Sequence, residues 1–342
     1  MLSIRELLSL HSACASLSET ANDDTIRNYL NAAFRPDWIH EMQLAVNRAL
    51  RAELPRRIRK RRWHIAIDLH DQPYYGSCAE LEPWVCQTLS KRSTNRFLRI
   101  ATAYVIKNGL RITAAMRVVR PEHKIEDIVS WLVAALRSDG IGIRRLWLDR
   151  GFASGAVVRR ITAMRLSAII ACPINGVKGG TRALCKGRRT YGIVHTFISN
   201  RYGRWSAYVS VVRALVKKKG RRKAKWLIFI QVGVRIPDKQ VKGLYRRRFG
   251  IESSYRLMNQ VRPRTTSRNP AIRYLLMAIG LILVNVWIML KHQHCRFVRR
   301  KKERINDAHL RLWRLADFIS HAVERRYGFV TAIDSLGQPV FP

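Results

Sequence analysis

Residues 124–174 read KIEDIVSWLVAALRSDGIGIRRLWLDRGFASGAVVRRITAMRLSAIIACPI. Apolar residues recur every three or four positions in the first part of this stretch, which predicts an amphipathic helix that ends at Gly140. The run over 143–149 predicts a short buried strand, 154–166 a second helix and 167–174 a second strand. Strands that alternate with helices along the chain are typical of an α/β fold.

The sequence before this stretch predicts further strands of the same sheet. The apolar run WHIAIDL over 63–69 has the length and composition of a strand. Two more apolar segments, 96–106 and 110–119, are separated by 107–109, which include a glycine and are typical of a hairpin turn. The order strand, hairpin, helix, strand, helix, strand predicts an α/β domain with a mixed sheet and flanking helices.

Residues 1–60 have the spacing of several short helices. Within them, 16–30 reads as a turn followed by a helix with Asp or Thr near its start, as in the recognition helix of a helix-turn-helix motif. A small helical bundle gives the same pattern. The basic linker PRRIRKRRW over 55–63 is suited to phosphate contact. We therefore predict a helical N-terminal DNA-binding region over 1–60.

The second half of the chain changes character twice. Residues 181–237 contain three strand-like runs and a basic segment, KKKGRRKAK, at 217–225, which together predict a β-rich insertion with a positive loop tip. From Asp238 onward the pattern is helical, so we predict a helical segment over 238–295 and a basic helical C-terminal region over 296–342.

One uncharged segment, YLLMAIGLILVNVWIML over 274–290, is long enough for a short membrane span, which needs about 17 residues. A helix buried in a globular core explains it more simply, because no second segment of this kind is present. The six cysteines form no C-x-x-C pair, and KHQHC at 291–295 has no second ligand pair at zinc spacing. We expect a reduced, cytoplasmic and nucleoid-associated protein.

The charge of the chain points to a polyanionic partner. Lys and Arg number 64 against 23 Asp and Glu, which gives a formal net charge of +41 spread over the whole length. Nucleic acid is the commonest partner of such proteins. Ribosomal and histone-like proteins share the charge, but they are usually shorter and poorer in Trp and long apolar runs. We expect a large, folded nucleic-acid-binding protein.

Three acidic residues stand beside apolar runs of this basic chain. Asp68 lies in WHIAIDLHD, Asp149 ends IRRLWLD, and Glu252 lies in YRRRFGIESSYRLMNQ. Acids at the ends of two buried strands are expected at the carboxyl edge of the sheet, where α/β folds gather ligands. Carboxylates brought together repel one another unless a cation bridges them, and Mg²⁺ or Mn²⁺ suits such oxygen ligands.

The third acid is expected on a helix. On an ideal helix Tyr245, Arg248, Glu252, Tyr255 and Asn259 fall within an arc of about 80°. That face would carry a carboxylate, a cation and polar side chains toward the two aspartates.

Each acid also has an ordinary structural interpretation. Asp71, in the same segment as Asp68, could be the ligand instead. Asp149 could open a turn before a helix, and Glu252 could form an intrahelical ion pair with Arg248 or Arg256.

Three motifs in this order carry a family resemblance: IDLHDQPYYG over 67–76, WLDRGFASGAV over 147–157, and the segment 245–270 that begins YRRRFGIESSYR. Over about residues 60–295 the chain resembles the DDE transposases of bacterial and archaeal insertion sequences. It is most similar to the group with a β-strand insertion before the catalytic Glu and a Tyr, Arg, Glu signature.

The resemblance implies an RNase H-like core, with its first part over 61–180 and its completion over 238–295. It implies that Asp68, Asp149 and Glu252 are catalytic and bind two Mg²⁺ or Mn²⁺ ions. Such a protein cleaves DNA at the terminal inverted repeats of the insertion sequence and joins the ends to target DNA. It also implies a homodimer assembled on DNA.

A set of basic and polar residues is expected to contact DNA. Tyr245 and Arg248 match the Tyr and Arg of the family signature. The group has a Lys seven residues after the Glu, where this chain has Asn259, and Arg256 is the nearest cation. Trp205, Tyr208 and Trp226 could stack on unpaired bases. The candidate DNA-binding residues are Tyr245, Arg248, Arg256, Asn259, Lys217, Lys218, Lys219, Arg221, Arg222, Arg299 and Arg300.

Two other functions fit the same residues. A domesticated DNA-binding protein could retain the fold without catalysis, and a metal-dependent nuclease could cut DNA without strand transfer. Three intact acids in a DNA-binding channel favour a catalytic protein.

Overall fold

The computed structural model describes residues 14, 17, 19, 21–52, 54, 61–76, 79–91, 93–107, 110–176, 180–199, 203–218, 221–299, 302–306 and 308–328. The chain forms two compact units, Gln43–Tyr255 in one and Met1–Met42 with Arg256–Pro342 in the other. The first unit holds the sheet and all three candidate acids.

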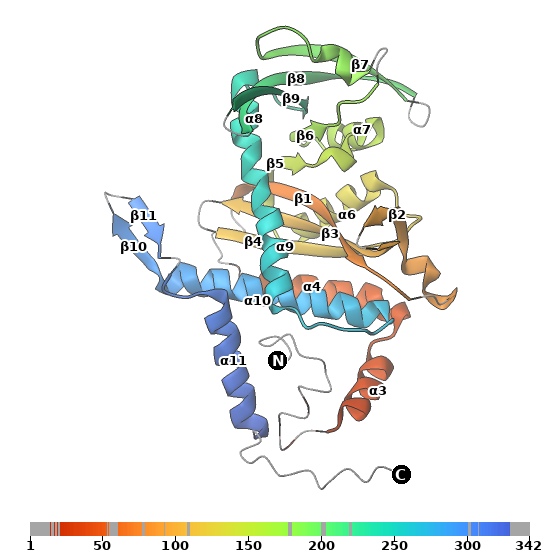
Figure 1. The fold of residues 1–342 in the computed structure, drawn as a ribbon, viewed down its shortest axis with the longest axis vertical. Helices are drawn as coiled ribbons and strands as arrows, with labels where there is room; N and C mark the ends of the chain where they lie inside the picture. Colours follow the sequence, from red (N-terminus) through yellow and green to blue (C-terminus); the bar gives the residue numbers. More distant parts are fainter. Residues whose placement is uncertain are drawn as a thin grey trace. The chain divides into compact units, whose positions relative to one another are not determined.

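The sheet of the first unit has nine strands in the order β2-β3-β1-β5-β6-β9-β8-β7, and β4 also pairs with β3 (Figure 1). The pairs β1/β5 and β5/β6 are parallel, whereas the other pairs are antiparallel, so the predicted mixed sheet is confirmed. Its strands are β1 (Arg62–Pro73), β2 (Cys86–Lys91), β3 (Thr94–Lys107), β4 (Leu110–Val119), β5 (Gly142–Leu148), β6 (Ala168–Cys172), β7 (Tyr191–Ser199), β8 (Gly203–Lys218) and β9 (Arg221–Val232).

Helices cover the sheet because its strands are apolar on both faces. Alternate residues of β1 point to opposite faces, and Ile65, Ala66 and Ile67 are all fully buried. Helices α6 (Ile125–Ser138) and α7 (Gly155–Ala163) follow the pattern predicted for 124–166, and Gly140 has the positive φ of 71° that a helix end of this kind requires.

The segment after β9 runs as α8 (Asp238–Tyr245), a 3-10 turn η5 (Arg246–Phe249) and α9 (Gly250–Val261). Val241, Tyr245, Ile251 and Tyr255 of this segment form a buried core with residues of the sheet. The sheet residues in this core include Ala66, Tyr104, Trp147, Ile169 and Phe229. This core fixes the segment that carries Glu252 against the face of β1 and β5 that presents Ala66 and Trp147.

The remaining described elements lead into the sheet or connect its strands. Helix α4 (Ile39–Ala52) spans the boundary between the two units, and its Asn47 side chain bonds the backbone of Met116 on β4. The connecting 3-10 turns are η2 (Ala79–Trp84), η3 (Arg150–Phe152) and η4 (Thr181–Leu184).

The second unit contains α3 (Asp23–Ala33), η1 (Pro36–Trp38), α10 (Pro270–His294), β10 (Arg296–Arg299), β11 (Lys302–Ile305) and α11 (Leu312–Tyr327). The helix predicted within 16–30 is present as α3, but Asn22 caps it, since its side chain accepts from the Thr25 N–H at 2.8 Å. The prediction that everything after Asp238 is helical was wrong at 296–305. These residues pair as an antiparallel hairpin, which alternating residues such as those of RFVR permit.

The apolar segment 274–290 lies in α10, which is long and apolar enough to cross a membrane by length and composition. In the most apolar 18-residue stretch of α10, 61% of the residues are buried. Part of the helix packs in an apolar cluster with Leu312 of α11. A helix within a protein core shows this burial, so the structure favours the core-helix interpretation.

Candidate active site

Asp68 and Asp149 come from neighbouring parallel strands. In the β1/β5 ladder Ile67 lies opposite Leu148; Asp68 is the next residue of β1, and Asp149 follows directly after the end of β5. The expectation that Asp68 ends its strand was wrong, because β1 continues to Pro73 by pairing with β3 alone. The two carboxylates are therefore neighbours at the point where the parallel pairing stops.

The helical segment reaches the same point although it is not one continuous helix. The 3-10 turn η5 interrupts it between Tyr245 and Gly250, so the ideal-helix arc does not apply across the break. Arg248 in the turn and Glu252 in the first turn of α9 still face the two aspartates. Glu252 is thus brought to Asp68 and Asp149 by the fold.

Arg248 joins the three acids. Its Nη2 lies 2.9 Å from Asp68 Oδ1 and 3.6 Å from Asp149 Oδ2, and its Nη1 lies 3.4 Å from Glu252 Oε1. The Arg248 side chain is only 2% exposed, whereas the side chains of Asp68, Asp149 and Glu252 are 15%, 47% and 53% exposed. The site is a shallow group of carboxylates over one buried cation.

The intrahelical pair between Glu252 and Arg248 is present, as the structural alternative predicted. It does not account for the whole arrangement, because the same guanidinium contacts acids from two strands. Asp149 precedes the 3-10 turn η3, but its side chain makes no capping hydrogen bond there. Its carboxylate is directed into the ion-pair group rather than used to start the turn.

The environment of Asp68 opposes its negative charge. Burial raises its pKa to about 6, and the neighbouring charges of Asp149 and Glu252 act in the same direction. Arg248 and the N–H of Leu69, which donates to Oδ1 at 3.0 Å, only partly offset these effects. A carboxyl whose charge is incompletely compensated by the protein is poised to gain from an additional cation.

Two tyrosines fix the helical segment to the strands that carry the aspartates. Tyr245 donates its hydroxyl to the carbonyl of Leu148 at 2.9 Å, next to Asp149. Tyr255 donates to the carbonyl of Asp68 at 3.4 Å, and its hydroxyl lies 2.6 Å from Thr102 Oγ1 on β3. Both rings are buried, and burial raises both tyrosine pKa values, so both stay neutral donors.

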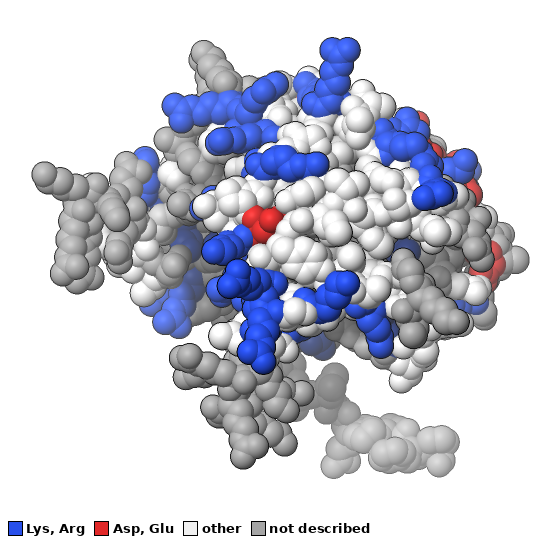
Figure 2. All heavy atoms as spheres, turned by 90° about the horizontal axis from the view of Figure 1, so that it is seen from above, with Lys and Arg blue, Asp and Glu red and all other residues white. Residues whose placement is uncertain are grey.

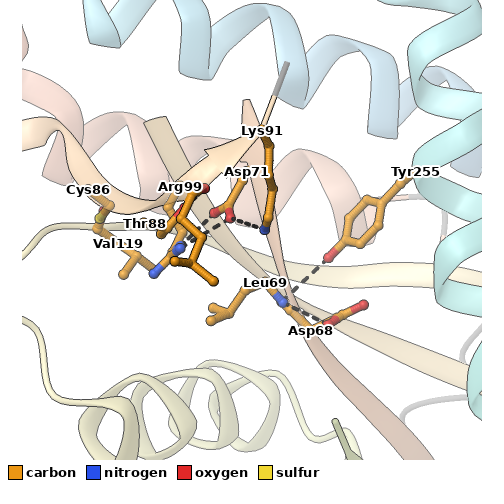
Figure 3. A network of polar contacts seen from close by, with 10 residues as sticks. Asp68, Leu69, Asp71, Cys86, Thr88, Lys91, Arg99, Val119 and Tyr255 are labelled. Carbon is orange, nitrogen blue, oxygen red and sulfur yellow. Dashed lines mark hydrogen bonds and ion pairs between the residues drawn. The ribbon is translucent and has the colours of Figure 1, made fainter. Parts of the chain in front are cut away.

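Asp71 belongs to a different network. Figure 3 shows its carboxylate with Arg99 and Lys91 and apart from Asp68. Arg99 lies directly opposite Asp71 in the β1/β3 ladder and bonds it with Nε at 2.6 Å and Nη2 at 3.1 Å. Burial opposes the charge of Asp71, but Arg99 outweighs it and lowers the pKa. The structure brings Asp68, and not Asp71, to Asp149 and Glu252.

The three acids offer carboxylate oxygens to a divalent ion, but they lie apart. No three His, Cys, Asp or Glu side chains of the described residues converge closely enough to hold one ion in this conformation. The donor chemistry does fit Mg²⁺ or Mn²⁺, because all three groups are hard carboxylate oxygens and two of them are half-exposed. Arg248 supplies the positive charge at present, so joint binding of an ion by all three acids requires side chains to rotate.

The residues expected to contact DNA differ in how exposed they are. Tyr245 and Arg248 are buried and bonded within the protein, so neither is available to DNA in this conformation. Arg256 and Asn259 are exposed on α9, and Asn259 accepts from Arg262 at 2.8 Å. Lys219 and Arg300 lie outside the described residues. Only the backbone is described for Lys217, Lys218, Arg221, Arg222 and Arg299, which lie in β8, β9 and β10.

The aromatic residues of the insertion are engaged within the protein. Trp205 stacks on Phe197 with ring centroids 4.0 Å apart and an interplanar angle of 7°. Tyr208 donates to Asp238 Oδ2 at 3.2 Å, and Arg235 lies over its ring. Trp226 lies opposite Arg213 in the β8/β9 ladder. Figure 2 shows one face of the molecule, on which Lys and Arg side chains prevail over Asp and Glu.

Sequence reasoning missed one residue beside the acids. His70 lies two positions after Asp68 on β1, hence on the same face of the strand, and its ring stacks on Tyr255 at 4.6 Å. The alternation of Asp68 and His70 around Leu69 was the signal that could have identified it.

Comparison with known proteins supports the fold. A solved structure of piggyBac transposase in a synaptic complex with hairpin DNA matches with a TM-score of 0.50 and 14% sequence identity. The match covers 79% of this chain and 55% of that chain, so the present chain spans about half the length of that protein. No protein-family model matches, and no curated protein matches. The nine-stranded mixed sheet with flanking helices agrees with the predicted RNase H-like fold.

Proposed function

We propose that this protein is a DNA transposase that cleaves DNA at the ends of an insertion sequence and joins those ends to target DNA. The observation that carries the proposal is that Asp68, Asp149 and Glu252, from three separate segments, contact one guanidinium at the edge of an RNase H-like sheet. The likeness to a transposase solved with DNA supports the substrate class, and the net charge of +41 fits it.

In this proposal Asp68, Asp149 and Glu252 hold Mg²⁺ or Mn²⁺, two ions per site. When bound there, such ions would supply the activation of a water or a DNA 3′-hydroxyl and the stabilisation of the leaving oxygen in an in-line displacement. The protein's own residues prepare the site. Arg248 keeps the acids together without a metal, Tyr245 holds the end of β5, and Tyr255 holds β1 at Asp68. Rigid support of this kind keeps reacting groups aligned.

Exposed cations are proposed to hold the DNA. Arg256 on α9 is close in sequence to Glu252 and is exposed, so it is the proposed substitute for the lysine that Asn259 replaces. The basic segments at 217–225 and 296–304 remain proposed phosphate contacts. A homodimer on DNA is also part of the proposal, because two DNA ends must be joined together.

The test uses labelled duplexes taken from the DNA that flanks the gene for this chain, with a supercoiled plasmid as target. Wild-type protein with Mg²⁺ or Mn²⁺ is compared with Asp149→Ala and with an EDTA control. We expect nicking and joining by the wild type alone. Nicking without joining would show that the protein is a nuclease and not a transposase.

A non-catalytic DNA-binding protein is the second candidate. The observation that favours it is that Arg248 already balances part of the charge of the acids. Binding of the duplex by both the wild type and Asp149→Ala, with cleavage by neither, would establish this candidate.

A further inference from the structure

A row of basic side chains crosses the sheet on the face that carries Asp68, nearer to the start of β1. His64 of β1 lies opposite Arg145 of β5 and Ile106 of β3. Ile106 in turn lies opposite Arg111 of β4. Paired residues of neighbouring strands point to the same side, and an even number of steps separates His64 from Asp68. The row therefore shares the face of Asp68 and crosses β1 about 13 Å before it.

Two further arginines add to this row. The register of the β1/β5 ladder shifts between Trp63 and His64, so Arg144 is an extra residue of β5 at a bulge. Bulges re-aim side chains and are frequent next to functional sites. Arg247 comes from the 3-10 turn η5. Burial lowers the pKa of His64 to about 4, and the charges of Arg145, Arg144 and Arg247 act in the same direction, so several cations converge on a neutral imidazole.

The positive charge of the row is not balanced within the protein. None of its four arginines forms an ion pair with an acid among the described residues. Burial and the charge of Arg144 lower the pKa of Arg145. Arg145 Nε and His64 Nδ1 are buried without a hydrogen-bond partner in the described part of the chain. Unpaired polar atoms beside uncompensated cations are typical of a place where an anion binds.

A buried core separates the basic row from the three acids. Ala66, which lies between the two groups on β1, is fully buried in one cluster with Tyr245 and Ile251 of the helical segment. The helical segment thus crosses this face of the sheet between the row and the acids. Arg248 contacts the acids, whereas the charge of Arg247, the residue before it, acts on His64 of the row. The row is a second charged site on the same face.

We propose that the basic row binds backbone phosphates of the DNA on which the protein acts, at a site separate from the three acids; the choice of DNA rests on the proposed function. Arginine guanidinium groups fit phosphate oxygens with two parallel hydrogen bonds. From β4 to β5 the row spans three strand spacings, about 14 Å in all, which suits a chain of phosphates better than a single one. With a rise of about 3.4 Å per base pair, the DNA held there lies a few base pairs from the bond at Asp68.

The first test measures binding of a fluorescent duplex in EDTA over a range of salt concentrations, so it does not depend on cleavage. Arg145→Gln and Arg247→Gln should each raise the dissociation constant about fivefold and lower the salt dependence by about one phosphate. Arg159→Gln is the matched control, because Arg159 is exposed on α7 outside the row and the variant loses the same charge. It should bind and respond to salt as the wild type does.

Arg247 is exposed, so its variant keeps the test valid if Arg145→Gln is poorly folded. Equal salt dependence in Arg247→Gln, Arg159→Gln and the wild type would overturn the proposal even if the protein cleaves DNA. Conversely, the expected changes in a protein that cleaves no DNA would contradict the proposed function and leave the phosphate site standing.

A second measurement locates the DNA on the wild type. Phenylglyoxal modifies accessible arginines, and peptide mass spectrometry reports which ones. The duplex should protect Arg144 and Arg247 and leave Arg159 reactive, and inorganic phosphate at the same phosphate concentration should protect them less. Equal modification with and without the duplex, or equal protection by inorganic phosphate, would overturn the assignment of the row to DNA.

Discussion

Asp68 and Asp71 lie on the same strand, three positions apart, and the protein treats them in opposite ways. An odd number of steps along a strand puts the two side chains on opposite faces. Asp71 meets Arg99 and Lys91, which lower its pKa. Asp68 meets Arg248 together with two further acids, and its pKa is raised to about 6. The negative charge of Asp71 is balanced by its basic neighbours, whereas that of Asp68 is balanced only in part.

In the proposed function, this difference separates a structural acid, Asp71, from a metal-binding one, Asp68. A carboxylate with its own cross-strand arginine contributes to stability and leaves no need for a ligand. A group of three acids that share one buried cation keeps unbalanced charge in a defined place, which is typical of sites that bind an additional cation. The sequence alone left Asp68 and Asp71 as alternatives, and their partners distinguish them.

The largest expected effect is on catalysis by Asp68→Asn. We expect metal-dependent DNA nicking to fall by about 10³-fold or more, because a proposed metal ligand is lost. The metal-free protein should keep its thermal midpoint or gain slightly, since burial already favours a neutral group there. Nicking rates and thermal unfolding in EDTA measure both effects. Activity close to that of the wild type would remove Asp68 from the site.

Arg248→Met tests the cation on which the acids depend. We expect the free energy of unfolding in EDTA to fall by about 2–3 kcal/mol, below the usual cost of breaking a fully buried ion pair, because two of the acids are half-exposed. Added Mg²⁺ should then stabilise the variant more than the wild type. Urea unfolding with and without Mg²⁺ measures both, and Arg248→Lys is the control that keeps the charge. An unchanged stability would show that Arg248 does not hold the acids together.

Asp71→Asn should lower the stability and leave DNA nicking nearly unchanged, which is the reverse of the effects expected for Asp68→Asn. Loss of the bidentate contact with Arg99 should cost about 1–3 kcal/mol of unfolding free energy, because both side chains are mostly buried. Nicking at a temperature well below unfolding should stay within a few-fold of the wild type. A large loss of nicking with intact stability would mean that Asp71 is the catalytic acid.

The smallest effects are in the pH dependence of stability, measured in EDTA. The lowered pKa of Asp71 stabilises the fold above the unfolded pKa of about 3.9, and this contribution is lost as the pH falls further. The stability gap between wild type and Asp71→Asn should therefore close below about pH 4. The raised pKa of Asp68 has the opposite sign, so Asp68→Asn should gain on the wild type as the pH rises from about 4 through 6. Parallel curves for the two variants would contradict the assigned environments.

Much of the fold was predictable because its signals are local. The helix and strand pattern of 124–174 and the three strands of the insertion follow from periodicity that the structure retains. The hairpin at 296–305 was missed because basic residues in a short segment suit a helix and a ribbon equally well. The break at Arg246–Phe249 was missed because a 3-10 turn leaves no distinct composition.

The sequence was enough to select the three candidate acids, but it did not show which cation lies between them. Asp68, Asp149 and Glu252 were identifiable from their places beside apolar runs and from the order of the motifs. That Arg248 is buried beneath them depends on three long-range contacts that spacing alone does not give. The hydrogen bonds of Tyr245 and Tyr255 are of the same kind, since each joins the helical segment to a distant strand.

Binding of Mn²⁺ to the protein with a duplex from the flanking DNA, followed by electron paramagnetic resonance of the free ion, tests the central claim most directly. Wild type, Asp68→Asn and Asp71→Asn are titrated side by side. If Asp68 is one of the ligands, the wild type and Asp71→Asn bind equally and Asp68→Asn binds at least tenfold more weakly. Equal binding by all three proteins, or a loss in Asp71→Asn alone, would show that the acids around Arg248 are not the metal site.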